Sequence, residues 1–179
     1  DILAVLRLAA EQRLKLVLVG AAEGWMVARQ IAEAKVPVAL DPSANLPGFE
    51  SLGTTFENAA RLQRGGVTVL LASFEAHNAR DLRNEAGVAV SYGMPWEAAL
   101  EALTRAPAKV WGTADRYGTL EAGKEADVVV WSGDPFELLT SAERVFVKGR
   151  EVPPDTRQRE LLQRYRTVGE RPVPAAYRP

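Results

Sequence analysis

Three short apolar runs, separated by segments of helical periodicity, most constrain what this chain can fold into. The runs are Leu14–Gly20, Val36–Leu40 and Val67–Ala72. Between them, apolar residues recur at helical spacing over Glu23–Ala34 and Thr55–Arg64. The runs are continuously apolar rather than alternating, which is typical of parallel strands covered on both faces. The order strand, helix, strand, helix, strand therefore predicts an α/β fold built on a parallel sheet.

Further helices are expected after the third run. Asn78–Tyr92 has the length and pattern of a longer helix, and Pro95 suits the first turn of the next one. A short helix is expected over Pro107–Gly112. We predict that Trp25 and Trp111 belong to the core.

The pattern changes after this helical region. Val128–Trp131 and Val145–Val147 are expected to be strands, because they are bounded by Gly, Asp and Pro. They indicate a hairpin-like or sandwich element that is separate from the first sheet. Asp127, which directly precedes the first of these strands, is expected to hydrogen-bond within the element.

The chain ends with a predicted helix and a Pro-rich tail. Asp155 with Gln158 is typical of a helix start, and Leu161, Leu162 and Tyr165 give this helix an apolar side that is expected to dock on the protein.

Two segments carry a resemblance to a known family. They are Gly118–Pro135, which reads GTLEAGKEADVVVWSGDP, and the strand-like run Arg144–Arg150. Together they resemble the C-terminal signature of the amidohydrolase superfamily, near its imidazolonepropionase-like members. The resemblance implies a metal-dependent hydrolase of non-peptide carbon–nitrogen bonds. It also implies a TIM-like (β/α)8 barrel flanked by a small β-sandwich built from both chain ends.

The resemblance covers almost the whole chain but only the C-terminal half of a family member. The expected fold class is therefore α/β, the C-terminal part of a TIM-like barrel plus part of a small β-sandwich. Residues 1–115 would supply barrel strands six to eight and the following helices. Residues 116–152 would supply the composite sandwich strands, and residues 153–179 a C-terminal helix and extended tail.

Barrel closure supports the same interpretation. A closed barrel of this type needs eight strands and roughly 250 residues, so three βα units leave bare strand edges. We therefore expect a partner, either the missing N-terminal half of the same protein or a homologous amidohydrolase subunit. The alternative is a small open α/β domain that folds alone, which would suit an independent binding module.

The family chemistry implies particular residues at the strand ends. Family members use a zinc-like divalent metal to activate water, with an aspartate after strand eight to move protons. By the resemblance, a metal-ligating histidine would fall near Gly20 and that aspartate near Phe74, and neither side chain can serve. Glu75 and His77, the chain's one histidine, are the alternative catalytic candidates, and His77 is also a possible metal ligand.

Each candidate also has a structural interpretation. Glu75 would suit the first turn of a helix, where the helix dipole favours a carboxylate, and His77 could bond the backbone at the helix start. Asn78 and Arg80 are the candidates for substrate binding. Arg80 and Arg83 fall three apart on one predicted helix, and they would either line the barrel mouth as anion binders or be solvated or paired with Glu85.

Two functions follow from these observations. The first is part of a hydrolase that acts on a small molecule, with the metal held mainly by the absent half. The second is a non-catalytic subunit with a degenerate metal site, which would be the structural or regulatory partner of an active homologue. The formal net charge of −1 gives no reason to expect nucleic acid or a membrane surface as partner, and no apolar run is long enough to span a bilayer. A soluble protein is expected, either cytoplasmic or exported.

Overall fold

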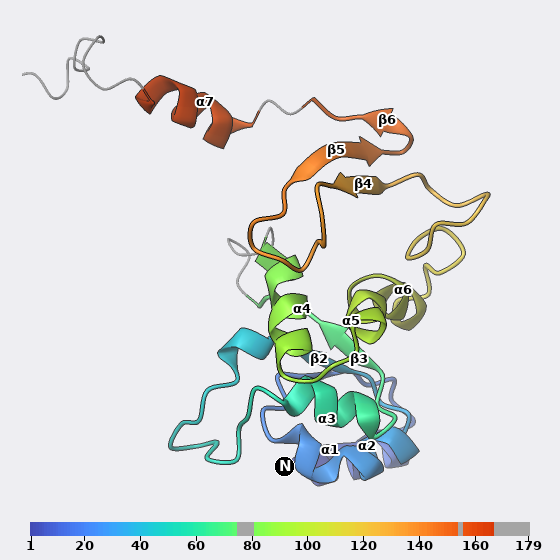
Figure 1. Cartoon of the computed structure of the whole chain (residues 1–179). Coiled ribbons are helices and arrows are strands. Elements are labelled where there is room, and N and C mark those ends of the chain that lie inside the picture. Colours follow the sequence, from blue (N-terminus) through green and yellow to red (C-terminus); the bar gives the residue numbers. More distant parts are fainter. Residues whose placement is uncertain (75–80, 154–155, 167–179) are drawn as a thin grey trace, which may run out of the picture.

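The computed structural model describes residues 1–74, 81–153 and 156–166 (Figure 1). The first part of the chain forms α1 (Ile2–Gln12), β1 (Leu18–Val19), the 3-10 helix η1 (Gly24–Val27), α2 (Ala28–Glu33), β2 (Val38–Leu40), the 3-10 helix η2 (Pro42–Ala44), α3 (Asn58–Arg64) and β3 (Val69–Leu71). The later part forms α4 (Leu82–Ser91), α5 (Trp96–Leu103), α6 (Arg105–Val110), β4 (Val128–Trp131), β5 (Ala142–Val147), β6 (Arg150–Glu151) and α7 (Arg157–Tyr165).

The first three strands form one parallel sheet in the order β1-β2-β3. The predicted parallel arrangement is thus confirmed. The strands are shorter than the apolar runs, because a strand extends only as far as its hydrogen-bonded pairing with a neighbour. In β2, this pairing begins at Val38, which lies opposite Leu18 of β1 and Val69 of β3. β2 and β3 are fully buried, whereas Val19 at the end of β1 is 65% exposed.

The core lies between this sheet and its helices. Ile31, Val38, Leu40 and Leu62 are fully buried there, and each contributes about 1.5–3 kcal/mol through burial of its side chain. In Figure 1, α1, α2 and α3 gather at one end of the molecule, and α4, α5 and α6 lie between them and the second sheet.

The first residues of α5 and α6 differ from those predicted. Pro95 precedes α5 as its capping residue, and α6 begins at Arg105, so that Pro107 lies inside its first turn. Proline is tolerated there because the first N–H groups of a helix have no acceptor within it. The prediction that Trp111 is a core residue is wrong. Trp111 follows the last residue of α6 and is 61% exposed, whereas Trp25 is half-buried.

The remaining strands form a second, antiparallel sheet in the order β4-β5-β6. The run predicted as one strand from Arg144 is in fact two strands, because Lys148 and Gly149 form a two-residue turn with φ values of 50° and 74°. The Oδ1 atom of Asp127 accepts a hydrogen bond of 2.7 Å from the Lys148 amide. The hydrogen-bonding role predicted for Asp127 is therefore confirmed.

The last helix, α7, is capped by Thr156, whose Oγ1 accepts from the Arg159 amide at 3.3 Å. The predicted cap, Asp155, lies outside the described residues. Leu162 and Tyr165 are 65% and 63% exposed, so the predicted docking of this apolar side is not found among the described residues. None of the helices in the described ranges is long and apolar enough to cross a bilayer.

Candidate active site

The carboxyl edge of the parallel sheet gathers the loops in which a functional site is expected. β1, β2 and β3 run parallel and end at Val19, Leu40 and Leu71, so the loops that follow them leave from the same edge. In parallel α/β folds, ligands bind outside the carboxyl ends of the strands. The loops after these strands are therefore the candidate active site.

The residues predicted to act here all follow β3 in the sequence. Glu75, His77, Asn78 and Arg80 lie outside the described residues, and their roles stay predictions.

The two positions at which the family would place its ligands are described. Gly20 follows β1 directly with a φ of 83°, and its amide donates to the Ala39 carbonyl at 2.9 Å. Phe74, three residues beyond β3, is 47% exposed. Both positions thus lie at the expected strand ends, and neither carries a metal-ligating side chain.

A cluster of Asp41, Ser43 and Glu85 joins two elements at this edge. Asp41 and Ser43 come from the loop after β2, and Glu85 comes from α4. Ser43 donates from its amide to Glu85 Oε2 at 2.8 Å, and its Oγ lies 2.9 Å from Glu85 Oε1 and 3.1 Å from Asp41 Oδ1. The hydroxyl has one proton and can donate to only one carboxylate at a time. The arrangement therefore suits a proton on the Glu85 carboxyl group.

The pKa of Glu85 responds to this environment. Partial burial raises the pKa above its ordinary value, and the charge of Asp41 and a hydrogen bond with its side chain raise it further. The two hydrogen bonds from Ser43 oppose the rise without cancelling it. Glu85 therefore keeps its proton to a higher pH than a free glutamate, which is the property required of a group that stores or delivers protons.

Sequence reasoning considered Glu85 only as a partner for Arg83 and missed this cluster. One signal was present, since Asp41 stands immediately after the second apolar run, where the carboxyl end of a parallel strand was expected. Nothing local links Glu85 to Ser43, which is 42 residues away.

The described residues do not make a zinc site. No group of three or more His, Cys, Asp or Glu side chains is close enough to hold a metal ion within the described ranges, and a catalytic zinc normally has three protein ligands. Asn45 Nδ2 and Asn84 Oδ1, from residues next to the cluster in the sequence, are buried and have no hydrogen-bond partner in the part of the chain that the structure describes.

A network around Asn58 ties the loop after β1 to the loop after β2. The fully buried Asn58 donates from Nδ2 to the Ala21 carbonyl at 3.0 Å and accepts at Oδ1 from the Trp25 amide at 3.1 Å. Trp25 Nε1 donates to the Gly53 carbonyl at 2.9 Å, and the Gly53 amide donates to Glu23 Oε1 at 2.7 Å. Ala21 has a φ of 40°, a strained value that such a network can hold in place.

Arg83 takes neither predicted role: it does not pair with Glu85, and its donors bind backbone carbonyls rather than being left for an anion. Its guanidinium donates to the carbonyls of Pro135 and Glu137, each at 2.7 Å, and is 5.3 Å from the centre of the Trp131 ring. Glu85 bonds to Ser43 instead. The physical reason is that residues two apart on a helix face different directions.

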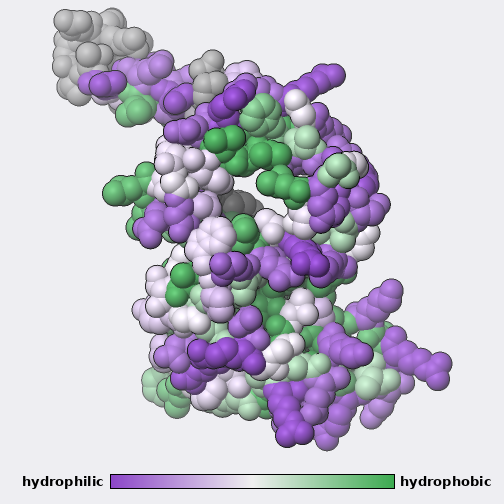
Figure 2. Space-filling model, turned by 45° about the vertical axis from the view of Figure 1, so that its right-hand side comes forward, coloured by the Kyte–Doolittle hydropathy of each residue, from purple (hydrophilic) through white to green (hydrophobic). Residues whose placement is uncertain are grey.

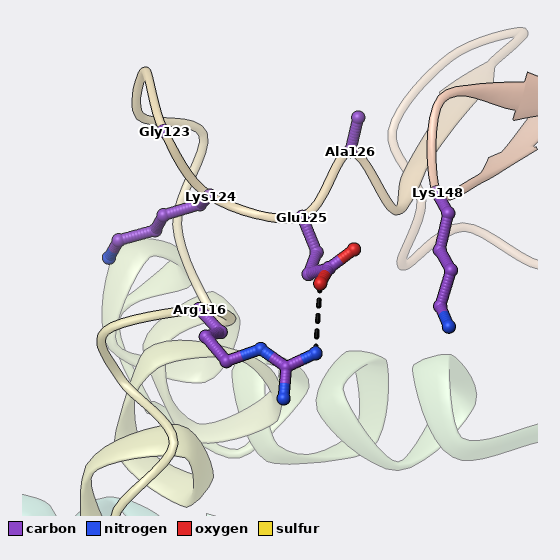
Figure 3. Close-up of a pocket in the computed structure, with 6 residues that line it drawn as sticks. All are labelled: Arg116, Gly123, Lys124, Glu125, Ala126 and Lys148. Carbon is purple, nitrogen blue, oxygen red and sulfur yellow. Dashed lines mark hydrogen bonds and ion pairs between the residues drawn. The ribbon is translucent and has the colours of Figure 1, made fainter.

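A polar hollow lies on the second sheet's side of the molecule, lined by residues between α6 and β4 and by Lys148 (Figure 3). Arg116 pairs with Glu125 across it at 2.8 Å, and Lys148 extends toward it from the turn between β5 and β6. Lys124 points away and pairs with Glu121 at 3.2 Å. Most of its charges are already paired, so this hollow has the character of a solvated surface rather than of a reaction centre.

Comparison with known proteins finds similarity to amidohydrolases. The model of the amidohydrolase family matches residues 63–153. Amidohydrolase tasK of Hapsidospora irregularis is 32% identical over 98 residues, which are 55% of this chain and 10% of that protein.

Solved structures extend the similarity over the earlier part of the chain. An amidohydrolase from Thermotoga maritima MSB8 superposes with a TM-score of 0.77 and 36% identity, and the match covers 85% of this chain and 40% of that one. An adenosine deaminase from Xanthomonas campestris, solved with bound zinc, superposes with a TM-score of 0.53 and 23% identity over 76% of this chain and 36% of that one. The chain thus spans less than half the length of these relatives.

Proposed function

Because this chain belongs to the amidohydrolase family, we propose that it is the C-terminal part of a metal-dependent hydrolase that cleaves non-peptide carbon–nitrogen bonds of a small molecule. The observation that carries the proposal is the likeness to the Thermotoga maritima amidohydrolase, which combines 36% identity with a TM-score of 0.77 over 85% of this chain. The carboxyl edge of β1–β3, with its cluster of Asp41, Ser43 and Glu85, is the part of the described structure suited to such chemistry.

The proposed architecture follows the family. Residues 1–115 would supply barrel strands six to eight with their helices, residues 116–152 strands of the sandwich, and residues 153–179 a terminal helix and tail. The parallel order β1-β2-β3 and the separate antiparallel sheet β4-β5-β6 support this division.

The proposed partner is the N-terminal half of the same protein, or a homologous subunit. Among the described strands, β1 and β3 each have a free edge, and parallel sheets are normally covered on both faces and closed or protected at their edges.

The second sheet also presents an uncovered apolar face. The strand register places Val129, Val145 and Val147 on one face, and Val129 and Val147 are 38% and 48% exposed. Figure 2 shows apolar side chains gathered on this part of the molecule, above an opening that separates it from the helices. An exposed apolar face of this kind is a surface for further protein to cover.

We place the metal mainly outside the described residues. Zinc bound to the Xanthomonas campestris deaminase supports a zinc-like ion in the complete protein. When bound, such an ion supplies an activated water for attack on a carbonyl-type carbon. The part of this chain that the structure describes offers no full ligand set for such an ion.

Elemental analysis of the natively purified protein tests the proposal, together with the mass of every chain that co-purifies. We expect about one or two zinc-like ions per assembly and hydrolysis of a panel of cyclic and linear amides. Glu75→Gln and His77→Ala should each lower kcat without dissociating the chains. A metal-free assembly with no hydrolytic activity would overturn the proposal and leave the chain as a structural subunit.

A further inference from the structure

The start of α4 is held from two sides by two different parts of the chain. Arg83 binds the connection between β4 and β5, and Glu85 binds η2 at the carboxyl edge of the parallel sheet. The second sheet and the candidate active site are thus attached to the same turn of one helix.

The contact made by Arg83 uses several of its donors. Nη1 donates to the carbonyls of Pro135 and Glu137, each at 2.7 Å, and Nη2 donates to the Leu138 carbonyl at 3.4 Å. The guanidinium also lies over Trp131, the last residue of β4. A planar guanidinium can reach several carbonyls at once, which a lysine ammonium on a flexible stem does not reproduce.

The segment that Arg83 binds is inserted between α4 and α5. Phe136 is 8% exposed, and its ring centre is 5.1 Å from that of Trp96. Asp134 accepts from Trp96 Nε1 at 3.0 Å and from the Phe136 amide at 2.9 Å. Gly87 of α4 leaves the necessary room, since a Cβ atom there would lie 2.6 Å from the Phe136 carbonyl oxygen.

We propose that Arg83 is a positioning residue that, through this contact with residues 135–138, fixes α4 so that Glu85 holds Ser43 and Asp41 at the carboxyl edge of the parallel sheet. The second sheet thereby takes part in shaping the candidate active site. The role of that edge in catalysis rests on the proposed function, whereas the mechanical link does not.

Hydrogen exchange at single amides tests the link in the protein as purified. The Ser43 amide, bonded to Glu85 Oε2, reports on the cluster, and the Phe136 amide reports on the inserted segment. The Val38 amide, which donates to the Thr68 carbonyl at 2.9 Å, is the reference for overall stability.

Arg83→Met should raise the exchange rates of Ser43 and Phe136 by at least about tenfold while that of Val38 changes much less. Arg83→Lys, which keeps the charge, should give a smaller rise at both and serves as the test if the methionine variant does not fold. Arg29→Met is the matched control, because Arg29 is exposed and, among the described residues, its side chain bonds only to Glu33 on its own helix.

Three outcomes would overturn the proposal. They are a rise at Phe136 alone, no rise at either amide, and an equal rise at all three, which would mean general destabilisation. Because the readout is exchange rather than turnover, it can fail while the hydrolase proposal stands. Conversely, a protein without hydrolytic activity that shows the expected exchange pattern would support the positioning role of Arg83 and contradict only the role of the carboxyl edge in catalysis.

Discussion

Replacement of Asn58 by alanine should destabilise the protein far more than replacement of any exposed polar residue. The side chain is fully buried and makes two hydrogen bonds, to the Ala21 carbonyl and from the Trp25 amide. Each bond contributes about 0.5–1.5 kcal/mol, and a buried backbone group left without a partner costs about 1–3 kcal/mol. We therefore expect Asn58→Ala to lower the free energy of unfolding by about 2–4 kcal/mol.

Urea denaturation followed by circular dichroism measures this loss, and Asn45→Ala is the control. Asn45 is 5% exposed, but its Nδ2 has no hydrogen-bond partner among the described residues, so its removal should cost less than about 1 kcal/mol. Equal losses for the two variants would refute the reasoning, because burial alone would then explain both.

Asn58→Asp sharpens the test. At neutral pH, the aspartate can still accept from the Trp25 amide, but it places a second oxygen opposite the Ala21 carbonyl, where Asn58 had a donor. We expect a loss at least as large as that of the alanine variant at neutral pH. Part of it should return at acidic pH, when the carboxyl group carries a proton that it can donate.

Three further predictions concern other contacts. A raised pKa of Glu85 means that the native state binds more protons than the unfolded chain, so the free energy of unfolding should fall as pH rises from about 4.3 through the raised value. Glu85→Gln, which mimics the protonated acid, should remove this fall in urea titrations run across pH. A difference from the natural protein that does not depend on pH would contradict the prediction. Gly87→Ala should lower the melting temperature although alanine is the better helix former, because its Cβ would meet the Phe136 carbonyl oxygen at 2.6 Å. An unchanged or raised melting temperature would show that residues 135–138 can move to relieve this contact. Asp127→Ala should increase hydrogen exchange at the Lys148 amide and lower the free energy of unfolding by no more than about 1.5 kcal/mol. If the Lys148 amide stays protected, its hydrogen bond to Asp127 is not what protects it.

The parallel sheet could be predicted from sequence because its signal is local. Each apolar run is long enough to show that both faces are covered, and each is followed by its own helix. The ends of the strands could not be predicted, because they depend on the pairing partner. The turn at Lys148 and Gly149 did have a signal, since a glycine inside a strand-like run suits a backbone with positive φ.

The candidate site was harder to foresee because its contacts join distant segments. Asp41 could be placed at a strand end, but its neighbour Glu85 reaches the same place only through the packing of α4 on η2. Spacing along the chain favours Glu85 as the partner of Arg83, whereas the acceptors of Arg83 in the structure are carbonyls 52 to 55 residues later. Backbone carbonyls have no sequence signature, so such a contact is invisible until the fold is known.

The same separation bears on the order in which the protein folds. The parallel sheet and α3 form from neighbouring βα units, whereas the contact of Arg83 with residues 135–138 closes a loop of 52 to 55 residues and carries the larger entropic cost. We expect this contact to form after the main folding barrier. Its loss should then leave the folding rate nearly unchanged and accelerate unfolding, so that this helix contact governs how long the native state persists rather than how fast it is reached.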